Sequence, residues 1–263
     1  MLSDNQARAA AELIWECWHE GRTIDVLPEN MRPANRNEGY AIQRHYERLS
    51  RRPIVGWKIA ATSAAGQAHI GVDGPLAGRL LAERVHKSGS TIPFGHNKMA
   101  VAEPEFAFRL SRDLPPAENP YKQIEVMAAV GSLHTAIEIP NSRFNRFEEA
   151  GTAQLIADNA CAHEFILGSE MPETWRYLDL AQHTVRATVE GKVTHDGVGA
   201  NVLGDPCIAL TWIANELSEH GIGLIAGQVI TTGTCAVPLP IRQGDSVTVD
   251  YGSLGSLKVR LSS

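Results

Sequence analysis

The sequence predicts an α+β protein, with a small helical N-terminal segment at residues 1–52 and a larger, curved β domain at residues 53–263. Two patterns lead to this prediction. Apolar residues in the N-terminal segment recur with helical spacing. From Ile54 onward, short apolar runs bounded by turn residues are typical of strands, and a few helical patterns interrupt them.

Two helices are expected in the N-terminal segment. The first follows a candidate cap at Ser3 or Asp4 and ends near Gly21. Its buried stripe follows the spacing i, i+3, i+4, i+7, i+8 and consists of Ala10, Leu13, Ile14, Cys17 and Trp18. In the second helix, Asn35 and Glu38 resemble a capping box, and the buried stripe consists of Ile42, Tyr46 and Leu49.

The β domain is expected to mix strands with helices. The expected strands are Ile54–Ala60, Met99–Leu110, Leu133–Pro140, Cys161–Leu167, Thr184–Val193, Gln228–Cys235, Ser246–Tyr251 and Leu257–Leu261. The expected helices begin after Asn119-Pro120, run from Glu148 to Asn159, and run from Cys207 to Ser218. Pro104 lies inside a strand and donates no hydrogen bond, so it marks a sheet edge or a bulge.

Composition and charge exclude several classes of function. With 263 residues and 43% hydrophobic content, the chain can fill a sizeable core. A net charge of -6 offers no basic face for nucleic acid, and no apolar run approaches the roughly 20 residues of a membrane span. The polar N-terminus is unlike a signal peptide, and the cysteines stand singly, as expected of a cytoplasmic protein with reduced thiols.

Two carboxylates stand close together in Glu103-Pro104-Glu105. Residues i and i+2 of a strand project from the same face, so Glu103 and Glu105 point together with Cα atoms roughly 6.5–7 Å apart, while Phe106 and Phe108 fall on the opposite face. Burying two such ions is unfavourable unless a cation compensates them. Oxygen ligands of this kind suit Mg²⁺ or Mn²⁺.

Glu138 and Lys58 are also charged residues within apolar strands. Glu138 would complete a three-carboxylate site, and Lys58 would place a cation near substrate oxygens. An alternating strand with one solvated face explains both residues equally well. The spacing alone therefore leaves two alternatives open, a metal site or a solvent-exposed sheet face.

Several longer segments form a set that spans nearly the whole chain. They are Gly56-Trp-Lys-Ile-Ala-Ala-Thr-Ser63, Ala102-Glu-Pro-Glu-Phe-Ala-Phe-Arg-Leu110, Ala136-Ile-Glu-Ile-Pro-Asn-Ser-Arg143, Ile156-Ala-Asp-Asn-Ala160, Gly199-Ala-Asn-Val-Leu-Gly-Asp-Pro206 and Gly227-Gln-Val-Ile-Thr-Thr-Gly-Thr234. Together they resemble the 2-keto-4-pentenoate hydratase family of the fumarylacetoacetate hydrolase superfamily, to which the 4-oxalocrotonate decarboxylases also belong.

The resemblance implies a fold and a set of site residues. The fold is a β-rich, fumarylacetoacetate-hydrolase-like domain around a twisted, partly closed sheet, and members are commonly homo-oligomers. The implied roles are Glu103, Glu105 and Glu138 as ligands of Mg²⁺ or Mn²⁺, Lys58 as the lysine beside the substrate, and Leu203 and Thr234 as candidate substrate contacts.

The resemblance also implies an activity on a small 2-oxoacid, with no role for nucleic acid or membranes. A hydro-lyase would add water to a 2-hydroxy-2,4-dienoate, or its 2-oxo-4-enoate tautomer, giving a 4-hydroxy-2-oxoacid in aromatic-compound catabolism. Lys58 would neutralise the carboxylate or enolate, or shuttle a proton. The alternatives are a 4-oxalocrotonate-type decarboxylase, a C–C hydrolase, and a non-catalytic subunit in complex with a related family enzyme.

One position departs from the hydratase pattern. Hydratases of this group commonly carry an aspartate in a Q-P-D-F-G-like segment after the lysine strand, whereas this chain has Leu76 at the corresponding place. Asp73 is close in sequence but shifted. His69, Glu83 or a metal-bound water are the candidates for the missing acid-base group.

Overall fold

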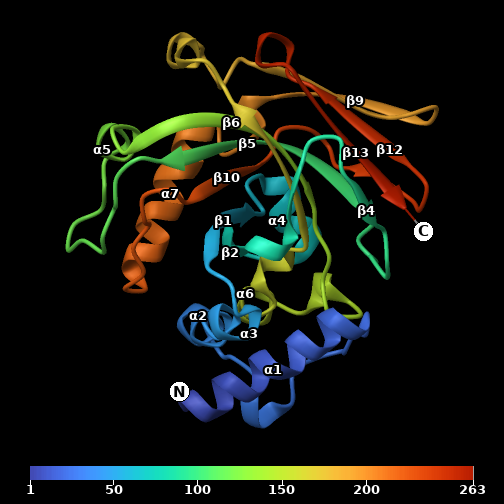
Figure 1. Cartoon of the computed structure of the whole chain (residues 1–263). Helices are drawn as coiled ribbons and strands as arrows, with labels where there is room; N and C mark the ends of the chain where they lie inside the picture. The colour runs from blue at the N-terminus through green and yellow to red at the C-terminus, as the bar shows by residue number, and fades with distance from the viewer. Residues whose placement is uncertain (263) are drawn as a thin grey trace.

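The structure, a computed structural model, describes residues 1–262 and contains two β-sheets with helices around them (Figure 1). The helices are α1 (Asp4–Glu20), α2 (Arg36–Gln43), α3 (Tyr46–Ser50), α4 (Ala64–Ile70), α5 (Gln123–Met127), α6 (Thr152–Ala157) and α7 (Pro206–Glu219). The strands are β1 (Ile54–Ala60), β2 (Leu76–Leu81), β3 (Val85–Lys87), β4 (Thr91–Pro93), β5 (Val101–Leu110), β6 (Val130–Ile139), β7 (Glu164–Glu170), β8 (Thr184–Val189), β9 (Val193–Val198), β10 (Val229–Thr234), β11 (Leu239–Pro240), β12 (Ser246–Asp250) and β13 (Ser256–Ser262).

The larger sheet forms the centre of the molecule. It has eight strands in the order β2-β1-β10-β5-β6-β7-β3, with β11 paired to β5, and it curls into a half-barrel (Figure 1). The smaller sheet has five strands in the order β4-β13-β12-β8-β9. This mixture of helices and a curled sheet confirms the α+β prediction. Within residues 1–262, no helix is both long and apolar enough to span a membrane.

The helices of the N-terminal segment lie together at one end of the molecule (Figure 1). Ser3 caps α1 in a capping box with Gln6, and Gly21 ends the helix with φ 64°, as expected. Asn35 caps α2 by accepting from the Glu38 amide, but the Glu38 carboxylate accepts from two other amides, so the predicted capping box is wrong. The single predicted helix is also wrong, because it is split into α2 and α3.

Several boundaries in the β domain differ from prediction. The region expected to be one strand at 184–193 is the hairpin of β8 and β9. The helix expected after Asn119 begins only at Gln123, and the strand expected from Cys161 begins at Glu164. β2 was missed because all of its residues are buried, which removes the alternation that identifies a strand.

The two faces of the larger sheet have different environments. On one face, Phe106, Phe108 and Ile137 pack into the large hydrophobic core that the helices and the smaller sheet share. On the other face, a small apolar cluster contains Leu80, Ala107, Ala136, Phe165 and Val229. Cross-strand partners share a face, and the register shows that Lys58 and the three candidate ligands, Glu103, Glu105 and Glu138, lie on this second face.

Pro104 lies in β5, a central strand between β10 and β6, so the edge alternative is wrong. The bulge alternative is confirmed, because the β10–β5 register shifts between Thr231 and Thr234, beside this proline. The Pro104 carbonyl accepts from the Cys235 amide at 2.7 Å.

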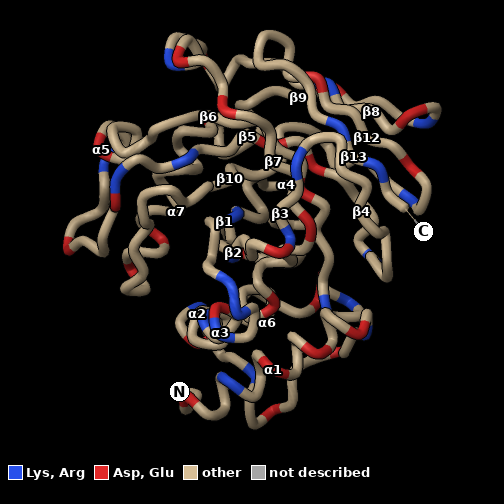
Figure 2. Tube along the Cα trace, viewed as in Figure 1, with Lys and Arg blue, Asp and Glu red and all other residues tan. Residues whose placement is uncertain are grey.

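Along the chain, basic and acidic residues are interspersed over the elements (Figure 2).

Candidate metal and substrate site

Three glutamates meet on the second face of the larger sheet. Glu103 lies directly opposite Glu138 in the β5–β6 register, and Glu105 follows two residues later on the same face. One carboxylate oxygen from each of the three lies within 4.8 Å of the others. Glu105 is 0% and Glu138 1% exposed, while Glu103 is partly exposed. The tertiary structure thus rejects the solvated-face alternative for Glu105 and Glu138.

Lys58 from β1 joins this cluster. Its Nζ lies 3.0 Å from Glu138 Oε1 and donates to the Ala160 carbonyl at 3.0 Å. Burial by itself lowers the pKa of Lys58, but the attraction of Glu138, Glu103 and Glu105 outweighs it and raises the pKa above its usual range. Lys58 is therefore charged at neutral pH.

The same surroundings make the carboxylates hard to ionise. Burial and the negative charge of Glu138 raise the pKa of Glu103 to about 7. Burial, Glu138 and Glu103 raise the pKa of Glu105 well above its ordinary 4.5. Burial also raises the pKa of Glu138, although Lys58 opposes this shift. One ammonium group does not compensate three buried carboxylates.

The donor set fits a hard divalent cation. Glu105 Oε1 and Glu138 Oε2 are enclosed without a hydrogen-bond partner among the described residues, and the Thr231 hydroxyl lies beside Glu105. Enclosed carboxylate oxygens without donors are costly unless a cation binds them. Three carboxylates at this separation leave room for further oxygen ligands, as Mg²⁺ and Mn²⁺ require.

Glu105 is positioned from both sides. Its Oε2 accepts from the Gly233 amide at 3.1 Å. The Tyr251 hydroxyl, from the end of the smaller sheet, accepts from the Glu105 amide at 2.9 Å and donates to the Ala136 carbonyl at 2.5 Å. Because Glu105 and Ala136 are register partners, the phenol bridges β5 and β6 at the carboxylate.

Strand pairing, a hydrogen bond and packing connect the segments of the two candidate substrate contacts to Glu105. Thr234 is the register partner of Glu105, although its hydroxyl donates to the Ala236 carbonyl at 2.7 Å. Leu203 has a left-handed backbone, with φ 48°, and its amide donates to the Thr62 carbonyl at 2.9 Å. Thr62 packs against Gly233, where an added Cβ would lie 2.2 Å from the threonine hydroxyl. Both segments therefore lie near Glu105.

Comparison with known proteins assigns the chain to a family. Residues 51–262 match the model described as fumarylacetoacetate (FAA) hydrolase C-terminal. The chain belongs to this family. Its match covers every candidate site residue, from Lys58 to Thr234.

Relatives of this fumarylacetoacetate hydrolase family member include several hydratases. It is 31% identical over 265 residues to 2-keto-4-pentenoate hydratase of Paraburkholderia xenovorans strain LB400, covering 100% of this chain and 97% of the relative. It is 32% identical over 232 residues to the 2-oxo-hept-4-ene-1,7-dioate hydratase of Escherichia coli, covering 85% of each. A solved structure of 4-oxalocrotonate decarboxylase from Pseudomonas putida G7, complexed with magnesium and adipate, superposes with a TM-score of 0.89 at 28% identity over 99% of both chains.

Leu76 occupies a buried position close to Lys58. It lies opposite Ala60 in the β1–β2 register, and Gly78, two residues along the same face, lies opposite Lys58. The aspartate expected of a hydratase would stand here, so an apolar side chain replaces an acid beside the lysine.

The shifted Asp73 and the two protein candidates for the acid-base role, His69 and Glu83, have other partners than Lys58. Asp73 is 86% exposed at its side chain and faces Arg36 at 3.8 Å. His69 packs edge-on against Phe147, and Glu83 accepts from the Ser50 hydroxyl.

Sequence reasoning missed the groups that orient the site. The Thr231 hydroxyl, the Gly233 amide, the Ala160 carbonyl and Tyr251 were not singled out. Gly233 had a local signal, because an isolated glycine in a strand often marks a bulge, and its φ is 95°. Ala160 lies in one of the segments that carry the family resemblance, but a main-chain carbonyl has no signature of its own, and Tyr251 had no signal because it follows β12 of the other sheet.

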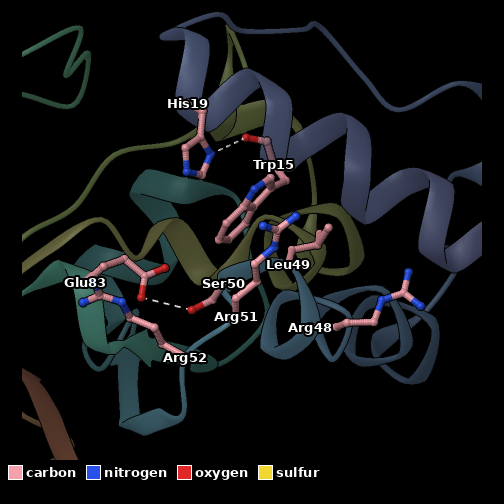
Figure 3. Close-up of a pocket in the computed structure, with 8 residues that line it drawn as sticks. All are labelled: Trp15, His19, Arg48, Leu49, Ser50, Arg51, Arg52 and Glu83. Carbon is pink, nitrogen blue, oxygen red and sulfur yellow. Dashed lines mark hydrogen bonds between the residues drawn. The ribbon is translucent and has the colours of Figure 1, made fainter.

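A separate pocket contains none of the residues of this cluster. It has a volume of about 570 Å³ and lies between α1, the end of α3 and the turn after β2 (Figure 3). Its lining residues are Trp15, His19, Arg48, Leu49, Ser50, Arg51, Arg52 and Glu83. Figure 3 shows Glu83 accepting from Ser50 at its edge. Glu83 is the one carboxylate among these lining residues.

Proposed function

We propose that this protein is a divalent-metal-dependent hydro-lyase that adds water to a 2-hydroxy-2,4-dienoate, or its 2-oxo-4-enoate tautomer. The observation that carries the proposal is the buried cluster of Glu103, Glu105 and Glu138 with Lys58 against it. The family match and the hydratase relatives support it. The proposed product is a 4-hydroxy-2-oxoacid, and the proposed cation is Mg²⁺ or Mn²⁺.

The proposed roles follow from the geometry. Glu103, Glu105 and Glu138 hold the cation, which when bound supplies Lewis-acid polarisation of the 2-oxo group. Lys58 is charged and buried beside Glu138, so its ammonium can neutralise the substrate carboxylate or donate to the enolate oxygen. Leu203 and Thr234 are the proposed contacts of the 2-oxoacid end of the substrate.

The proposal also concerns the assembly. The oligomeric state expected from the resemblance is a homo-oligomer in the cytoplasm, and a complex with a related family enzyme is a further proposal. Light scattering of the purified protein, alone and mixed with such an enzyme, tests both statements. A monomeric mass in both samples would refute them.

A second candidate function is decarboxylation of 4-oxalocrotonate. Leu76 favours it, because the position beside Lys58 holds no acid to assist hydration. The superposition with the decarboxylase at a TM-score of 0.89 also supports it. In this reaction the substrate loses CO₂ and takes up a proton, giving 2-hydroxypenta-2,4-dienoate.

One assay separates the candidates. Purified protein is incubated with 2-hydroxypenta-2,4-dienoate or with 4-oxalocrotonate, in Mg²⁺, in Mn²⁺ and in excess EDTA. Metal-dependent loss of the dienoate, with 4-hydroxy-2-oxopentanoate as product, supports hydration, and release of CO₂ from 4-oxalocrotonate supports decarboxylation. Turnover of neither substrate refutes both functions for these substrates and supports a non-catalytic subunit. A mock preparation from cells that carry the empty vector is the control for contaminating activity.

A further inference from the structure

Two segments of the chain lie next to the site without contributing a ligand. They meet in a buried ion pair between Asp158, 0% exposed, and Arg143, 1% exposed. Arg143 Nε donates to Asp158 Oδ1 at 2.5 Å, and the Arg143 amide donates to Oδ2 at 3.0 Å. The Ser142 hydroxyl also donates to Oδ2, at 2.6 Å. Three donors therefore already engage this carboxylate, and it is not part of the three-glutamate cluster.

Asp158 is followed directly by a left-handed turn. Asn159, Ala160 and Cys161 have φ values of 56°, 50° and 60°, a conformation that residues with a Cβ rarely adopt. Three such residues in succession need neighbours that hold them in place. Arg143 contributes directly, because its guanidinium donates to the carbonyls on both sides of the turn, those of Asp158 and Ala162.

The turn is also tied to β2. The Asn159 side chain accepts from the Arg79 amide at 2.6 Å and donates to the Arg79 carbonyl at 2.9 Å, as a neighbouring strand would. Gly78 makes this approach feasible, since a Cβ there would lie 2.3 Å from the Asn159 carbonyl oxygen. The turn therefore has a defined position relative to β1, the partner of β2.

This position matters because the Ala160 carbonyl is the hydrogen-bond acceptor of Lys58. The ammonium group has three N–H donors. One is directed to Ala160, and Glu138 Oε1 lies 3.0 Å from Nζ. With one hydrogen bond to a carbonyl and one ion-pair contact, the ammonium retains at least one N–H that is available to a substrate oxygen.

We propose that Asp158 and Arg143 are positioning residues for Lys58. The ion pair holds the left-handed turn, the turn places the Ala160 carbonyl, and the carbonyl together with Glu138 orients the ammonium towards the substrate. Lys58 would otherwise be free to move fully onto Glu138, which would withdraw a ligand from the cation. This inference rests on the proposed function, because it assigns the orientation of the lysine that acts in it.

The main test is Asp158→Asn, which keeps the shape and removes the charge that fixes Arg143. We expect kcat to fall about tenfold or more, because small displacements of a catalytic group have effects of this size, while KM and the Kd for Mn²⁺ alone stay within about twofold. Glu216→Gln is the control, because it weakens another ion pair, the partly buried one with Arg36, whose residues lie outside the three-glutamate cluster. It should lose stability without losing kcat.

A double-mutant cycle separates positioning from general damage. In a Lys58→Met background, Asp158→Asn should lower the residual kcat by less than about twofold, because the group it orients is absent. An equal loss in both backgrounds, or wild-type kcat in Asp158→Asn, would overturn the proposal. If Asp158→Asn does not fold, Ser142→Ala removes one donor to the same carboxylate and is expected to give a smaller loss with the same pattern.

A measurement without substrate keeps this inference distinct from the proposed function. The Nζ signal of Lys58 in ¹⁵N-lysine NMR spectra, assigned by its loss in Lys58→Met, should be resolved in the wild type and shifted or lost in Asp158→Asn. If neither substrate is turned over but the signal behaves this way, the proposed function fails and the positioning role stands. An unchanged signal, or none in the wild type, refutes the positioning role whatever the activity.

Discussion

Replacing Glu103 by glutamine should stabilise the metal-free protein at alkaline pH and weaken the metal-bound protein. Glutamine has the shape of a protonated glutamate and carries no charge. The pKa of Glu103 is raised from its ordinary 4.5 to about 7 by burial and by Glu138. The metal-free native state therefore binds this proton more tightly than the unfolded chain does.

The sign and size of the effect follow by linkage. Between pH 4.5 and about 7 the native state carries the proton and the unfolded chain has released it, so wild-type stability falls as pH rises through this window. A pKa difference of about 2.5 corresponds to about 3 kcal/mol. Because Glu103 is partly exposed, solvent screening reduces this to about 1–2 kcal/mol. Glutamine does not titrate and avoids this loss.

Urea unfolding in EDTA at pH 8 and at pH 4.5 measures the effect. Glu103→Gln should exceed the wild type by about 1–2 kcal/mol at pH 8, with the difference disappearing at pH 4.5. In saturating Mn²⁺ the order should reverse, because the wild type binds the cation more tightly. The exposed Glu118→Gln is the control and should change neither value. A Glu103→Gln protein that is less stable than the wild type at pH 8 in EDTA would contradict the reasoning.

Three further predictions concern single side chains. Glu105→Gln should leave the fold intact while weakening Mn²⁺ binding and activity, and wild-type affinity by calorimetry would refute its assignment as a ligand. Tyr251→Phe removes the hydroxyl that bridges β5 and β6 at Glu105, so the affinity for Mn²⁺ should fall about tenfold. Tyr46→Phe is the control, because it removes another buried hydroxyl and should lower stability without changing Mn²⁺ affinity. The third prediction concerns His163, which accepts a hydrogen bond from the Trp18 indole and whose pKa burial lowers to about 4. Because the unfolded chain binds this proton more tightly, the free energy of unfolding should fall by about 3 kcal/mol as pH drops from 6.5 to 4. His163→Gln, which keeps an acceptor but does not titrate, should flatten that part of the pH profile, and an unchanged profile would contradict this.

The sequence predicted the parts of the fold that depend on local pattern. The first helix follows from a cap, an apolar stripe and a terminal glycine, and all three lie within one segment. The strand with Glu103 and Glu105 follows from its alternation. β2 and the break between α2 and α3 could not be predicted, because burial on both faces and tertiary packing override the local pattern.

For the candidate site, local spacing placed Glu103 and Glu105 on one face but left metal binding and solvent exposure as equal alternatives. The tertiary structure rejects solvent exposure for Glu105 and Glu138, because both are buried where the β5–β6 register sets Glu138 opposite Glu103 and Lys58 approaches from β1. The metal role of these residues and the contacts of Leu203 and Thr234 stay predictions.

The sequence by itself determined which groups are available: three carboxylates, one lysine, and Leu76 where an aspartate was expected. These are properties of residue identity and of the two-residue period of a strand. Only the tertiary structure decided what surrounds them, including the Tyr251 hydroxyl at Glu105 and the Ala160 carbonyl at Lys58. The physical reason is that those partners come from another sheet and from a left-handed turn about a hundred residues away, and such contacts depend on packing between distant segments rather than on local pattern.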